Sequence, residues 1–222
     1  MWIFTILISA SALLMGLTII IRNPNLQENR YFFLLNLLAS FWVLSNYFAS
    51  FMGHKYAGPL VGIDFGTAIG MSYIMFFFSA TFTGIFKNKQ KFILYKRFAL
   101  AILLSIEFIV LFTTLVIKKI VITSAGIDVV PGALYVVYTL LLILPIVASA
   151  YFFLSSYYRS NILKKIQIKF IAFGIMLAAF ILIITNLVLP RFISSIALAT
   201  VVQESGYLGL ITFLGLTTYS MI

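Results

Sequence analysis

Residues 87–97 read KNKQKFILYKR and hold five basic side chains between two long apolar stretches, residues 62–86 and 98–117. The same arrangement recurs twice, with basic residues in the gap before residue 31 and in the gap before residue 169. Basic residues therefore alternate with apolar stretches along the chain. This pattern is typical of a protein that crosses a membrane several times.

Seven apolar stretches are long enough to cross the hydrocarbon core of a bilayer, which takes about 20 residues of α-helix. The composition agrees, because 63% of the residues are hydrophobic and 9% are charged, against roughly a quarter charged in soluble domains. We therefore predict an all-α integral membrane protein, a seven-transmembrane helix bundle that forms one domain over residues 1–222. The predicted spans are residues 2–21, 31–52, 62–86, 98–117, 133–156, 169–189 and 202–222.

The gaps between these spans predict the orientation, because Lys and Arg near span ends stay on the cytoplasmic side. The odd-numbered gaps hold eleven basic residues and the even-numbered gaps hold four. We expect the N-terminus outside and the C-terminus in the cytoplasm of a multi-pass plasma-membrane protein. The eleven are Arg22, Arg30, Lys87, Lys89, Lys91, Lys96, Arg97, Arg159, Lys164, Lys165 and Lys169.

The net charge of +10 is explained by this asymmetry and predicts lipid headgroups, not nucleic acid, as the electrostatic partner. The chain has no cysteine, which excludes disulfides and thiolate metal sites. We predict no metal site and no cofactor. The first stretch has no basic residue before its apolar run, so we expect a retained helix and not a cleaved signal peptide.

Polar side chains inside the predicted spans are the candidate site, because burying them in hydrocarbon is costly. Glu107 falls near the middle of its predicted span, and Trp42 is expected to line the same site. The other candidates fall in the outer third of their spans. Together they predict a cavity of negative character that is open to the outside and binds a small molecule or a lipid. The predicted ligand-binding residues are Trp42, Asn46, Asp64, Glu107, Tyr135, Tyr138, Asn186 and Glu204.

Each candidate also has a purely structural interpretation. Asp64 and Glu204 suit helix N-termini, where the macrodipole favours acids. Tyr135 and Tyr138 suit an aromatic belt at the membrane surface. Asn186 suits the turn loosened by a proline four residues later. A carboxylate in mid-span needs a partner, water or a proton, so we expect Glu107 to face the bundle.

Glycines at positions 58, 62, 66 and 70 recur every four residues, as on a helix face that another helix approaches closely. Because Pro59 lies between the first two, we assign Gly58 and Gly62 to a loop. At 100° per residue Asp64 lies on a different face from the glycines. The lone histidine, His54, is expected in an external gap, solvated.

Several segments resemble the N-terminal seven-transmembrane region of bacterial sensor histidine kinases. They are NRYFF at residues 29–33 with Asn36 and Trp42, GALYVVY at 132–138, QIKF at 167–170 with Gly174, and TNLVLP at 185–190. The resemblance implies a receptor module that signals to a cytoplasmic kinase output domain, in cis or in trans. It also implies a homodimer.

The chain itself has neither a cytoplasmic phosphoacceptor histidine nor a nucleotide-binding segment, so we do not expect an enzyme. We expect either a membrane region whose kinase follows Ile222 or a stand-alone receptor. Residues 202–222 contain no lysine for a retinal Schiff base, and the motifs of G-protein-coupled receptors are missing. A small transporter of the three-plus-one-plus-three type remains the alternative.

Overall fold

The computed structural model describes residues 2–51, 54–86, 89–123, 126–183 and 196–222. They form seven helices and one β-hairpin. The helices are α1 (Trp2–Arg22), α2 (Gln27–Phe51), α3 (His54–Thr83), α4 (Lys89–Phe112), α5 (Tyr135–Arg159), α6 (Ile162–Ile183) and α7 (Ile196–Met221). Five of the seven begin before the predicted span, α1 begins with it, and α5 begins two residues after it.

The helical bundle agrees with the predicted fold class, and one short β-hairpin is added to it. Strands β1 (Ile117–Thr123) and β2 (Gly126–Pro131) pair antiparallel between α4 and α5. The β-branched residues of IKKIVIT favour a strand. Of these seven residues, only Ile117 falls within a predicted membrane span. Gly132, which follows β2, lies directly against the backbone that precedes β1, because a Cβ there would collide with the carbonyl of Leu115.

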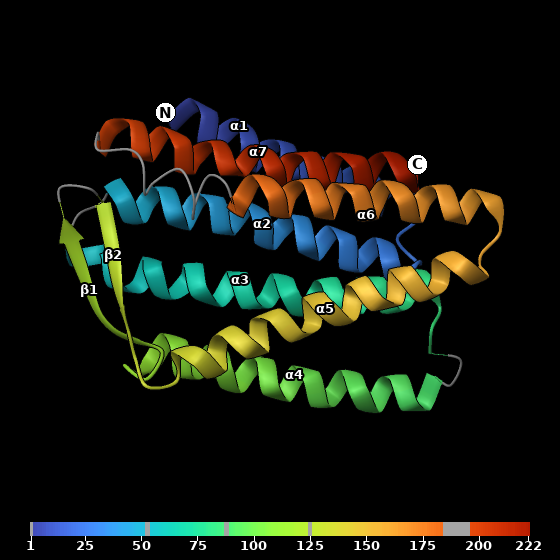
Figure 1. Ribbon diagram of the computed structural model, residues 1–222, viewed down its shortest axis with the longest axis horizontal. Helices are drawn as coiled ribbons and strands as arrows, with labels where there is room; N and C mark the ends of the chain where they lie inside the picture. Colours follow the sequence, from blue (N-terminus) through green and yellow to red (C-terminus); the bar gives the residue numbers. More distant parts are fainter. Residues whose placement is uncertain (1, 52–53, 87–88, 124–125, 184–195) are drawn as a thin grey trace.

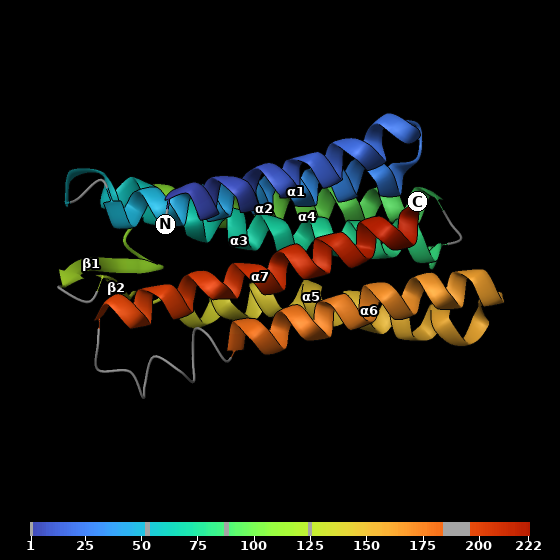
Figure 2. The ribbon, with the colours of Figure 1, turned by 90° about the horizontal axis from the view of Figure 1, so that it is seen from above.

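The helices run up and down, so the two ends of the chain lie at opposite ends of the bundle (Figure 1). Helices α1, α2, α3 and α4 pack in sequence order as one layer, and α5, α6 and α7 form a second layer (Figure 2). The layers meet where α3 packs on α5 and where α1 packs on α7. Helix α3 is central, because it contacts α2, α4, α5 and β1.

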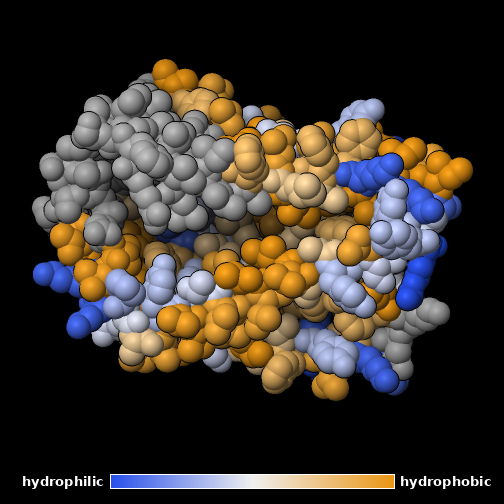
Figure 3. Space-filling view, in the orientation of Figure 1, coloured by the Kyte–Doolittle hydropathy of each residue, from blue (hydrophilic) through white to orange (hydrophobic). Residues whose placement is uncertain are grey.

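The bundle exposes apolar side chains that a soluble protein would bury. Figure 3 shows them over the middle of one face, with hydrophilic side chains gathered at the two ends. Over the described residues, α1, α2, α3 and α5 are long and apolar enough to cross a membrane. The chain is therefore a helical membrane protein by length, composition and exposed surface. Exposed residues of α5 alone include Val136, Leu140, Leu144, Val147, Tyr151 and Leu154.

Glycines bring α6 and α7 into close contact. A methyl group at Gly174 would lie 3.2 Å from Cα of Phe213, and one at Gly209 would lie 3.1 Å from Cα of Ala178. Backbone approaching backbone in this way is how small residues pack helices in membranes. The two helices therefore form a tight pair.

Candidate functional site

Glu107 lies in the contact between α3 and α4, against the glycine face of α3. A methyl group at Gly66 would lie 3.7 Å from Oε2 of Glu107, and one at Gly70 would lie 3.6 Å from Oε1. A methyl group at Gly62 would lie 3.3 Å from Leu111, one turn further along α4. The glycines thus leave room for a carboxylate between two helices. As expected, Glu107 faces the bundle and not the lipid.

Tyr138 of α5 closes the same region from the other layer. Its buried hydroxyl donates a hydrogen bond to the backbone carbonyl of Phe65, with an O to O distance of 2.8 Å. The Phe65 ring lies 5.3 Å from the Tyr138 ring and 6.3 Å from that of Tyr135. Tyr138 is therefore anchored inside the bundle, which contradicts its assignment to a surface aromatic belt.

The ring of Tyr135 lies 6.5 Å from that of Tyr138, and Asp64 is the residue before Phe65 in α3. We call Asp64, Glu107, Tyr135 and Tyr138 the polar cluster. Within the described ranges neither carboxyl is paired with a Lys or Arg. Oδ1 of Asp64 is buried and has no hydrogen-bond partner there. The cluster thus holds two carboxyl groups that have no basic partner within the described residues.

The helix bounds decide the two interpretations that depend on position. Asp64 follows the first residue of α3 by ten positions, and Glu204 follows that of α7 by eight. Both lie beyond the first turn, where the macrodipole acts, so the helix-entry interpretation is wrong. Glu107 lies five residues from the end of α4, which is closer to that end of the helix than the predicted mid-span position.

Helices α4 and α3 begin earlier than their predicted spans, because basic and turn-forming residues before each span belong to the helix. Helix α4 extends back through Lys96 and Arg97, whose long aliphatic stems can lie along apolar surface while the charge stays in water. Helix α3 includes Pro59, so Gly58 and Gly62 are helical and their assignment to a loop is wrong. The helix starts at His54, whose side chain lies outside the described part.

Other predicted residues lie elsewhere. Trp42 packs edge-to-face on Tyr207 of α7, with ring centroids 5.6 Å apart, in a small core with Ile8 and Val43. Asn46 is half-buried on α2. The side chain of Glu204 and all of Asn186 lie outside the described residues. Of the eight predicted residues, the structure brings Tyr135 and Tyr138 together at Phe65 of α3. Asp64 and Glu107 lie on or against the same helix.

Sequence reasoning overlooked a set of neutral polar side chains buried where α1, α2 and α7 pack. Ser9 hydrogen-bonds to Ser40 between α1 and α2. Oδ1 of Asn36 and the hydroxyls of Thr5 and Thr217 are buried without a partner among the described residues. Asn36 had the same signal as Glu107, a polar side chain well inside an apolar stretch, and could have been identified by it.

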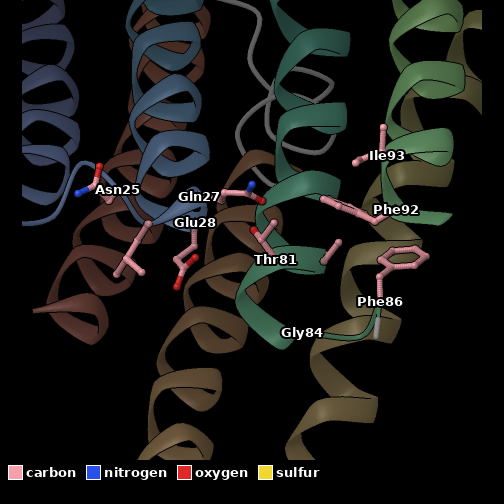
Figure 4. Close-up of a pocket in the computed structure, with 10 residues that line it drawn as sticks. Asn25, Gln27, Glu28, Thr81, Gly84, Phe86, Phe92 and Ile93 are labelled. Carbon is pink, nitrogen blue, oxygen red and sulfur yellow. The ribbon is translucent and has the colours of Figure 1, made fainter. Parts of the chain in front are cut away.

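A pocket at the opposite end of the bundle was also not predicted. It has a volume of about 460 Å³ and lies between the turn before α2, the end of α3 and the start of α4. Figure 4 shows Gln27 and Thr81 at the gap between α2 and α3, with Phe86 and Phe92 on the α4 side. Its carboxyl group, Glu28, is the single acid near the odd-numbered gaps. Glu28 was therefore the feature of the sequence from which a site at this end could have been predicted.

The end of α7 is tied to two other helices at this same end. The Arg22 guanidinium of α1 donates to the backbone oxygen of Ile222. The Gln167 amide of α6 donates to the carbonyl of Ser220 at 2.8 Å. Any movement of α7 relative to α1 or α6 must therefore break or exchange one of these hydrogen bonds.

Comparison of the chain with models of protein families, with curated proteins and with solved structures gives no match.

Proposed function

We propose that this chain is a membrane-embedded receptor module that binds a small cationic ligand at the polar cluster. The observation that carries the proposal is the buried Oδ1 of Asp64, which has no hydrogen-bond partner, with no basic residue paired to Asp64 or to Glu107 in the described part. Acidic groups in a membrane interior are costly without a partner. A bound cation would supply the missing charge, and the rings of Phe65 and Tyr135 offer aromatic surface to an organic one.

The proposal includes seven transmembrane helices, an outside N-terminus and a cytoplasmic C-terminus. Its support is that the up-and-down fold gathers the described residues of the odd-numbered gaps, which carry most of the basic residues of the chain, at the end where α7 finishes. The polar cluster then lies in the outer half, and the ligand comes from outside the cell.

The signal would leave through α7 to a cytoplasmic kinase output domain, in cis or in trans, of a homodimeric receptor, as the resemblance to sensor kinases implies. The ties of α7 to Arg22 and Gln167 support this route, because they offer contacts that two bundle states can make differently. Coupling requires that the ligand bind one of these states more tightly than the other.

The test is thermal unfolding of the purified full chain in detergent with a panel of primary and quaternary amines. We expect at least one amine to raise the unfolding temperature of the native chain. Asp64→Asn should abolish the rise, whereas Glu28→Gln, which removes an acid at the opposite end, should keep it. The proposal fails if no amine acts, or if Asp64→Asn leaves the rise intact.

The transporter alternative is separated by the same amine in proteoliposomes. A receptor binds it saturably without accumulating it inside the vesicles. Flux of the amine across the membrane that is lost in Asp64→Asn would replace the receptor proposal with a transporter.

A further inference from the structure

A groove runs along the outer side of the α3–α4 contact, where β1 crosses it. It has a volume of about 460 Å³. Its walls are the first turns of α3, the last turn of α4 and strand β1. The lining residues are Gly58, Pro59, Gly62, Ile63, Val110, Leu111, Phe112, Thr113, Ile117 and Ile120.

The groove exists because of two local features. The first is that Gly58 has no heavy atom within 4 Å of where its Cβ would be, and no side chain of its own to occupy that space. The second is an irregularity in the register of β1 between Ile117 and Lys119. An extra residue in a strand shifts the alternation of its side chains, so Ile117 and Ile120 both face the groove.

The walls offer almost no polar group to an occupant. The one side-chain hydroxyl, that of Thr113, already donates to the carbonyl of Ile109 at 2.6 Å. Ile63, Leu111 and Phe112 are also exposed on the surrounding surface. The groove is thus continuous with the apolar surface that faces lipid, and hydrocarbon is the occupant that its walls fit.

Two exposed lysines lie on β1, next in the chain to residues that line the groove. Lys118 and Lys119 lie between the two isoleucines of β1 that line it, and both are exposed. Lysine ammonium groups near a membrane surface stay at the headgroup level and attract anionic lipids. These two are also the basic residues of the even-numbered gap that this hairpin fills.

We propose that the groove holds one acyl chain of an anionic phospholipid whose phosphate binds Lys118 and Lys119. The inference rests on the membrane location of the bundle and not on the cationic ligand of the polar cluster. An apolar wall and two adjacent lysines together fit an anionic amphiphile better than a second copy of this chain, whose net charge is also positive.

The test uses the full chain in nanodiscs that contain phosphatidylglycerol or phosphatidylcholine with the same photoactivatable acyl chain. Mass spectrometry of the cross-linked peptides gives the site and the yield. We expect labelling within residues 110–120, with about thirtyfold preference for phosphatidylglycerol, as two lysines at the headgroup level should give. Lys118→Gln with Lys119→Gln should bring that yield down to the phosphatidylcholine level. Arg159→Gln with Lys164→Gln, at the opposite end, should not.

A second pair of variants tests the acyl chain. Gly58→Leu has room for its side chain and should fill the groove, which removes the labelling of residues 110–120 by both lipids. Ala101→Leu adds the same bulk at an exposed position of α4 and should leave the labelling unchanged. Thermal unfolding of each variant shows that it is folded.

Labelling that survives Gly58→Leu, equal labelling by the two phospholipids, or equal capture of a photoactivatable free fatty acid would each overturn the proposal. None of these measurements involves an amine. Failure here therefore leaves the receptor proposal standing, and failure of amine binding leaves the lipid site standing.

Discussion

Two helix contacts in this bundle are lined by glycine, and they use it for opposite purposes. Between α6 and α7, Gly174 and Gly209 face the backbone of the other helix at 3.2 and 3.1 Å from their added methyl groups. Between α3 and α4, Gly66 and Gly70 face the carboxyl of Glu107 at 3.7 and 3.6 Å. The first contact packs two backbones together. The second makes room for an acid.

The difference separates a structural contact from a candidate binding contact. Dense backbone packing stabilises helices in a membrane, so α6 and α7 should move as one body. An acid between α3 and α4 destabilises that contact unless something neutralises it. A bound ligand would therefore stabilise the α3–α4 contact more than the α6–α7 contact.

The largest effect should come from Glu107→Gln, which keeps the shape of the side chain and removes its charge. We expect the affinity for the cationic ligand to fall by about 2–5 kcal/mol, as when one partner of a buried charge pair is truncated. The free energy of unfolding without ligand should not fall, because an unpaired acid is lost. Titration with the amine found by the thermal screen measures the affinity. Denaturant unfolding in micelles measures the free energy of unfolding. A loss of stability larger than the loss of affinity would assign Glu107 to structure.

The second-largest effect should come from Gly209→Ala. We expect this substitution to lower the free energy of unfolding by about 1–3 kcal/mol, the usual range for overpacking. Its new methyl group meets the Cα and carbonyl oxygen of Ala178, which are backbone atoms and cannot swing aside. Denaturant unfolding in micelles measures the loss. Gly215→Ala on the same helix is the control, since its nearest neighbour is the flexible end of Met15 at 3.7 Å. Equal stability of the two variants would mean that α6 and α7 are not closely packed.

A smaller effect should follow from Tyr138→Phe, which removes the hydroxyl that ties α5 to the carbonyl of Phe65. Hydrogen bonds between transmembrane helices contribute about 0.6 kcal/mol on average and up to about 1.7, and we expect a loss of stability in that range. Tyr151→Phe, on the exposed face of the same helix, should cost less. If both variants lose the same stability, the bond to Phe65 does not hold α5 on α3.

Much of this arrangement could be predicted from sequence, and the reasons differ between regions. The helices and their order follow from hydropathy, because apolar runs of this length have few other solutions in a membrane. The position of Glu107 against the bundle follows from the cost of placing an acid in lipid. Tyr138 was identified as a site residue, but its partner, the carbonyl of Phe65, carries no sequence signal.

The hairpin and the groove could not be predicted in the same way. Ile117 and Ile120 are as apolar as residues of a membrane-spanning helix. Hydropathy alone does not distinguish a strand from a short helical segment. The groove depends on an irregularity of strand register and on three elements that are distant in sequence. The prediction that Glu107 faces the bundle was more accurate than the prediction of its position along the helix. The position differs because the basic residues at the start of α4 belong to the helix.

The smallest effect, and the one that tests the comparison most directly, should come from Gly66→Ala. The new methyl group would lie 3.7 Å from Glu107, which is ordinary van der Waals contact. Alanine is a better helix former than glycine by about 1 kcal/mol. We therefore expect a gain in stability of up to about 1 kcal/mol, opposite in sign to the same substitution at Gly209 and measured by the same denaturant titration. A loss at both positions would mean that α3 and α4 pack as closely as α6 and α7, and that Glu107 has no room for a ligand beside it.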